Sequence, residues 1–249
     1  MGHCVVKNPA AGGGRWVEVP PERLVTWVVT FAERHGGAAV GQPVTTRESG
    51  VAVTFAVTFA AADGATAECH PPFPPLPAGV PGAVRAAAEA LAAHAAADRT
   101  VGVLLVRLGG YAAGVFSGSP PRLVDSKTGS RPVHGRSAAG GWSQQRFARR
   151  RENQAATALR AAADAAAEVF GRYGPDRLDA VVLGGDKRSA AGLADLRGDA
   201  GLEKCLAKAT GRFLTVPDPR LAVLRDIPRA FLATRIRLTE PESIGPARR

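Results

Sequence analysis

The chain has 249 residues, of which 45% are hydrophobic, and a formal net charge of +10. This length and apolar content support one large or two ordinary folded domains and exclude general disorder. The charge favours a polyanionic partner such as nucleic acid, and the longest apolar run ends at Arg107, too early to span a membrane.

The cysteines, the histidines and the first residues indicate the cellular compartment and whether a metal site is present. Cys4, Cys69 and Cys205 are too far apart for a CxxC metal site, and the five histidines are scattered. No signal peptide is evident at the start of the chain. We therefore expect reduced cytoplasmic thiols and no zinc site.

Residues 1–97 predict a small α+β domain. Strict alternation of apolar and small or polar residues over 51–59 is typical of a strand with one buried face. The expected elements are a flexible lead-in (1–14), a helix opened by Pro20-Pro21 and ended by Gly36-Gly37, the strand 51–59, a partner strand (66–70) and an alanine-rich helix (81–97).

A second, mixed α/β domain is expected over residues 98–238, followed by a flexible tail over 239–249. Its first strand, 101–108, is a near-continuous apolar run of the kind found at the centre of a sheet. The further expected elements are strands at 111–117, 122–126, 178–183 and 213–216, a long helix from 143 or 144 to about 173, and helices at 193–196 and 202–209.

A basic loop and helix start over residues 127–154 is the most informative segment. Between positions 131 and 151 it contains six arginines and no acidic residue. Buried guanidinium groups need partners that this segment lacks, so we expect a polyanion to order it. Arginine forks bind phosphate oxygens in bidentate fashion, and a helix N-terminus adds its dipole. The expected RNA-binding residues are Arg131, His134, Arg136, Arg146, Arg149 and Arg150.

Two glycines and two glutamines follow one another in this segment. Gly140 and Gly141 remove side chains where the backbone must pass close to another surface. Gln144 and Gln145 then occupy the last loop position or the first helical turn. Glutamine does not titrate near neutrality, but it orients a water molecule and donates a hydrogen bond to a developing oxyanion. The alternative interpretation is a mobile loop that serves only solubility.

The order of motifs in this segment resembles a known catalytic loop. The motifs are His134-Gly135-Arg136, Gly140-Gly141, Ser143 and Arg146-Phe147-Ala148-Arg149. They look like the loop and following helix in the central domain of eukaryotic and archaeal class I release factors, and the resemblance covers about residues 98–238. The chain departs from that pattern by the insertion 137–139 and by Trp142 at the glutamine position.

A glutamine displaced past Gly-Gly is the variant of the Vms-type release-factor-like peptidyl-tRNA hydrolases, and the chain resembles an actinobacterial branch of that group. The resemblance implies an RNase H-like fold for the second domain. It implies a cytoplasmic, monomeric enzyme of ribosome quality control that releases stalled nascent chains from obstructed large ribosomal subunits. Its partners would be ribosomal RNA and peptidyl-tRNA, and the catalytic role passes to Gln144, with Gln145 as the alternative.

Two other functions remain open at this stage. A non-catalytic tRNA- or ribosome-binding factor would use the basic loop only for docking. An RNA nuclease would need metal-binding carboxylates, and Asp125, Asp179 and Asp186 form no convincing set. Residues 183–189 follow a strand but lack the spacing of a Walker loop, so an NTPase is not expected.

Overall fold

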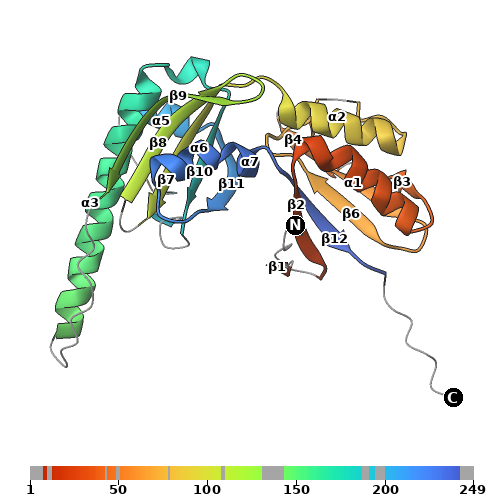
Figure 1. Ribbon diagram of the computed structural model, residues 1–249, viewed down its shortest axis with the longest axis horizontal. Coiled ribbons are helices and arrows are strands. Elements are labelled where there is room, and N and C mark those ends of the chain that lie inside the picture. Colours follow the sequence, from red (N-terminus) through yellow and green to blue (C-terminus); the bar gives the residue numbers. More distant parts are fainter. Residues whose placement is uncertain are drawn as a thin grey trace. The chain divides into compact units, whose positions relative to one another are not determined.

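The computed structural model describes residues 8–9, 13–42, 44–48, 51–77, 79–107, 110–130, 143–186, 191–193 and 200–241. The chain forms two compact units, residues 1–97 with 232–249, and residues 98–231. Each unit is built on its own sheet with helices packed against it, which confirms the mixed α/β class (Figure 1).

The first unit is a sheet with the strand order β1-β2-β12-β6-β5-β3, in which β4 pairs with β5. Its helices are α1 (Pro21–Arg34) and α2 (Val84–Ala96). Its strands are β1 (Asn8–Pro9), β2 (Arg15–Val19), β3 (Ala38–Val40), β4 (Val44–Glu48), β5 (Val51–Ala61), β6 (Thr66–His70) and β12 (Thr234–Thr239).

Local sequence explains the helix and the hairpin of this unit. Leu24, Val28 and Phe31 recur at helical spacing and are buried, so they give α1 one apolar stripe toward the sheet. Val57 and Phe59 are fully buried on the same face of β5, as their alternation predicts. The expected helix after Pro20 and the expected strand pair are therefore confirmed.

The last strand departs from the sequence-based prediction. The pattern assigns residues up to 238 to the second domain and residues 239–249 to a tail, whereas β12 pairs with β2 and β6 of the first unit. Ile236 is fully buried in the core of that unit. The elements expected from the sequence include no strand here, and no local pattern says which sheet the segment joins, because its partners are distant in sequence. Residues 242–249 lie outside the described residues.

The second unit has the sheet order β11-β10-β7-β8-β9, with β7, β10 and β11 parallel and β8 and β9 antiparallel. Its strands are β7 (Val101–Arg107), β8 (Gly110–Ser117), β9 (Arg122–Ser130), β10 (Ala180–Gly185) and β11 (Ala209–Thr215). Its helices are α3 (Ser143–Gly171), the 3-10 turn η1 (Pro175–Arg177), α5 (Ala200–Leu206), α6 (Leu221–Asp226) and α7 (Pro228–Phe231).

Helices on both faces explain why β7 is apolar along nearly its whole length. On one face, Leu104 packs in a core with residues of α3 and α5. On the other face, the rings of Phe116 in β8 and Phe231 in α7 meet edge to face at 5.6 Å. Gly102 in β7 lies under Phe170 of α3, whose ring would be 3.1 Å from an added Cβ atom, so the glycine lets the helix approach the sheet closely.

Candidate functional site

The basic segment singled out in the sequence connects the edge strand β9 to the helix α3. Strand β9 ends at Ser130 and α3 begins at Ser143. The connecting residues, including Arg131, His134, Arg136, Gly140 and Gly141, lie outside the described residues.

The remaining predicted residues belong to the beginning of α3. Gln144 and Gln145 fall in its first turn, and Arg146, Arg149 and Arg150 in the first two to three turns. The structure describes the helical backbone there and not the positions of these side chains. A helix of this kind presents free N–H groups and the positive end of its dipole at the end that carries the glutamines.

The segment leaves the sheet at the edge where its parallel strands end. Strands β7 and β10 reach this edge at Arg107 and Gly185, where β8 begins with Gly110 opposite Arg107. Because Gly110 is paired with Ser130, the end of β9 lies at the same edge. The carboxyl edge of parallel strands is where α/β sheets commonly place their functional loops.

Helix α3 is much longer than the part of it that packs against the sheet. Its 29 residues span about 43 Å at the usual rise per residue. Among the helix residues whose side chains the structure describes, from 156 onward, the first that packs against the core of the unit is Leu159, and full burial begins at Ala162. About 24 Å of helix therefore precede Leu159, and Figure 1 shows this beginning of α3 extending past the end of the sheet.

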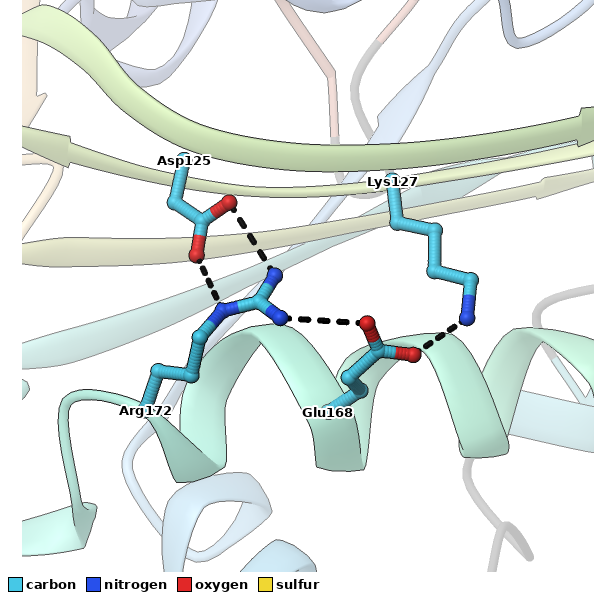
Figure 2. A network of polar contacts seen from close by, with 4 residues as sticks. All are labelled: Asp125, Lys127, Glu168 and Arg172. Atoms are coloured by element: carbon cyan, nitrogen blue, oxygen red, sulfur yellow. Dashed lines mark hydrogen bonds and ion pairs between the residues drawn. The ribbon is translucent and has the colours of Figure 1, made fainter.

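The packed half of α3 is joined to β9 by a charge network of four residues, Asp125, Lys127, Glu168 and Arg172 (Figure 2). Arg172 donates from Nε and Nη2 to the two carboxylate oxygens of Asp125, at 2.7 and 3.1 Å. It also donates from Nη1 to Glu168 at 3.0 Å, and Lys127 donates to the other oxygen of Glu168. Two strand residues on one face thus hold Glu168 of α3 and Arg172, which directly follows the helix.

The network shifts the ionisation of its members toward the charged forms. Hydrogen bonds from Lys127 and then from Arg172 lower the pKa of Glu168. The hydrogen bond to Glu168 raises the pKa of Lys127. Asp125 and then Glu168 raise the pKa of Arg172. Three of the four side chains are exposed and Asp125 is half-buried, so the network adds little to global stability, but the bidentate arginine restricts how α3 lies on β9.

This network was not predicted from the sequence, although the spacing of its residues within each element is visible there. Glu168 and Arg172 are four residues apart at the end of a helical pattern, and Asp125 and Lys127 are two apart on a strand. Each pair alone is common on protein surfaces. Their meeting depends on how α3 crosses β9, and only the tertiary structure supplies that crossing.

Arg107 organises the carboxyl edge of the sheet. Its Nη1 donates to the carbonyl oxygen of Val216 at 2.9 Å, and its Nε lies 3.8 Å from both Asp186 and Asp218. The loop after β10 is thereby drawn toward the loop after β11. Lys187 and Arg188, which directly follow this edge, lie outside the described residues.

The three aspartates weighed for a nuclease are not brought together. Asp125, on β9, binds Arg172, and Asp186 lies beside Arg107 at the carboxyl edge. Asp179 precedes β10 at the opposite edge and accepts a 2.7 Å hydrogen bond from the backbone N–H of Thr100. Within the described part of the chain, no group of three metal-binding side chains converges.

Among the described residues, none of the helices has the length and apolar character that a membrane crossing requires.

The chain is similar to known proteins in sequence and in structure. Residues 99–237, more than half of the chain, match the family described as "Actinobacteria/chloroflexi VLRF1 release factor". No curated protein matches the chain in sequence. A similar solved structure is that of the archaeal translation termination factor aRF1, with 14% identity over 84% of this chain and a TM-score of 0.37. The match spans 61% of the length of that factor. On the family match, the chain belongs to the VLRF1 release factors of Actinobacteria and Chloroflexi.

Proposed function

We propose that the chain is a ribosome-dependent peptidyl-tRNA hydrolase that releases stalled nascent chains from obstructed large ribosomal subunits. The observation that supports this most is the shape of α3, whose glutamine-bearing first turn lies about 22 Å along the helix from Leu159. Figure 1 shows that the beginning of the helix extends past the end of the sheet. An extension of this kind suits delivery of a side chain into a site made by another molecule.

The chemistry proposed for this turn is positioning and electrostatic stabilisation. Gln144, with Gln145 as the alternative, orients the water that attacks the ester between peptide and tRNA. Its amide N–H donates to the oxyanion that develops on the ester carbonyl. The free N–H groups and the dipole of the helix start favour the same negative charge. Since the ribosome supplies the rest of the centre, the proposal requires no metal or organic cofactor.

Binding rests on the arginines around this turn. Arg131, Arg136, Arg146, Arg149 and Arg150 would contact phosphates of ribosomal RNA and tRNA, with His134 beside them. Gly140 and Gly141 would let the loop pass through a narrow site. The net charge of +10 adds long-range attraction to RNA. In this proposal the protein acts in the cytoplasm as a monomer.

A release assay tests the proposal. Large subunits carrying labelled peptidyl-tRNA are mixed with saturating protein, and free peptide is separated from peptidyl-tRNA over time. The variant carrying Gln144→Ala and Gln145→Ala should lose release by at least about a hundredfold and still sediment with the subunits, because the arginines remain. The single variants identify which glutamine acts.

The other outcomes are distinct. Release by the double variant at the wild-type rate would contradict the proposed chemistry. Binding by the wild-type protein without release would favour a non-catalytic docking factor. Shortened tRNA with an intact ester would favour a nuclease, and its loss in EDTA would support a metal-dependent one.

A further inference from the structure

The sheet of the first unit carries different chemistry on its two faces. One face, which includes Val57, Cys69 and Ile236, packs in a single core with residues of α1 and α2. Because side chains alternate along a strand, the intervening residues of β2, β12 and β6 point to the other face. These residues are half-buried or exposed, and they are Trp16, Glu18, Thr66, Glu68, His70, Arg235, Arg237 and Thr239.

The register of the strands arranges six of these side chains in two rows across the sheet. The rows are Glu18, Arg235 and His70, and Trp16, Arg237 and Glu68. Opposite residues of an antiparallel pair point to the same face and lie within contact distance. Each row therefore places an arginine of β12 between a residue of β2 and a residue of β6.

Three planar groups meet on this face. The guanidinium carbon of Arg235 lies 4.0 Å from the centre of the Trp16 ring. The rings of Trp16 and His70 meet edge to face, with their centres 5.4 Å apart. Nε2 of His70 lies 2.8 Å from Oε1 of Glu68, a contact that orients the imidazole. Aromatic rings and guanidinium planes are the groups on which unpaired RNA bases stack.

The charges of this face are balanced. Two arginines stand beside two glutamates, and burial lowers the pKa of His70, so that its ring is neutral near pH 7. Carboxylates accept hydrogen bonds from base amino groups, and guanidinium groups donate to base oxygens and nitrogens. Both groups have several donor or acceptor sites, so each can contact a base edge while it keeps its neighbour in the sheet. The face is therefore suited to bases more than to phosphates.

The same face lacks the aliphatic groups that a protein partner would bury. Among its described residues in β2, β12 and β6 there is no valine, leucine or isoleucine. The centre of a protein–protein interface is more apolar and is depleted in charged residues. The net charge of +10 adds long-range attraction to RNA. The observations thus favour RNA over a protein as the occupant.

We propose that this face of the first unit binds unpaired bases of single-stranded RNA, which stack on Trp16, Arg235 and His70. Glu68 and Arg237 contact the edges of the stacked bases. Apart from β12, the first unit lies outside residues 99–237, which match the release-factor family. The inference is independent of the proposed hydrolase activity.

The fluorescence of Trp16 in the full-length protein reports stacking at this face. The chain has three tryptophans, so Trp27→Phe with Trp142→Phe leaves Trp16 alone. The probes are unstructured RNA oligomers of A, C or U, about ten nucleotides long. Because a base stacked on the indole quenches its emission, titration should give saturable quenching with at least one oligomer. The matched control, Trp16→Phe with Trp142→Phe, keeps Trp27 of α1 on the other face and should show no saturable quenching.

A second substitution separates stacking from charge. Arg235→Lys keeps the cation but removes the guanidinium plane. In the protein that retains only Trp16, it should weaken the affinity for the oligomer by about fivefold or more. Arg34→Lys is the control, because Arg34 is an exposed arginine of α1, and it should leave the affinity unchanged.

Several results would overturn the proposal. They are the absence of saturable quenching with every oligomer, equal quenching in the control that keeps Trp27, and equal affinity in Arg235→Lys. Equal quenching by inorganic polyphosphate would show recognition of phosphate in place of bases, and equal quenching by duplex RNA would show that the bases need not be unpaired.

Discussion

If its glutamines are delivered to the ribosome, helix α3 acts as a lever whose direction the charge network restricts. The contact between α3 and the sheet consists largely of alanines, among them Ala162, Ala165 and Ala166. Such small side chains interdigitate weakly and leave the crossing angle loosely defined. Glu168 bridges Lys127 and Arg172, so Glu168→Gln weakens both charged contacts at once.

The magnitude follows from the length of the helix. Glu168 and Gln144 are 24 residues apart, about 36 Å along α3. A tilt of about 5°, well inside the usual scatter of about 15–20° in packing angles, moves the first turn by about 3 Å. Since misplacement by about 1 Å can cost about a hundredfold in rate, and only part of the population tilts, we expect release to slow by about tenfold.

The assay is single-turnover peptide release at saturating protein, with ribosome affinity measured alongside. Asp164→Asn is the matched control, because Asp164 is an exposed carboxylate on the same helix and outside the network. The thermal midpoint should barely change in either variant, since these side chains are exposed. Equal release by Glu168→Gln and Asp164→Asn would refute the lever argument.

A readout independent of activity separates this prediction from the proposed function. Spin labels at Asn153 on α3 and at Arg122 on β9 report the direction of the helix through their distance distribution. Glu168→Gln should broaden that distribution and Asp164→Asn should not. Broadening without slower release would mean that the helix is oriented by the network but that its first turn is not catalytic.

Three further predictions concern ionisation, packing and thiol reactivity. The pKa of Glu168 in the folded protein is lowered from 4.5. The contribution of this carboxylate to stability is therefore complete above about pH 4.5 and is lost as the pH falls through the lowered value. An NMR titration should show the pKa of Glu168 rising toward 4.5 in Lys127→Met, and an unchanged pKa would contradict the pairing. Phe170→Ala, at a fully buried position in α3, should lower the free energy of unfolding by about 3–5 kcal/mol in urea titrations, and a loss below about 1 kcal/mol would contradict the packing. Burial raises the pKa of Cys69, and Cys205 is likewise buried; alkylation mapped by mass spectrometry should spare both until the chain unfolds.

Much of the second unit could be read directly from the sequence. The apolar run beginning at Val101, the antiparallel strand after it and the long helix from Ser143 all occur where periodicity predicts them. Their signals are local, because each depends on which neighbouring residues share a face. The glutamines and arginines of residues 131–151 were likewise visible as a cluster, since a run of cations without acids needs no tertiary information to be recognised.

Tertiary structure alone decided how distant parts meet. It assigned β12 to the first sheet through its pairing with β2 and β6, and it brought Asp125 and Lys127 to Glu168 and Arg172. Periodicity says which face of an element is apolar, but partners that are remote along the chain are selected by packing of the whole core, which no short window of sequence contains.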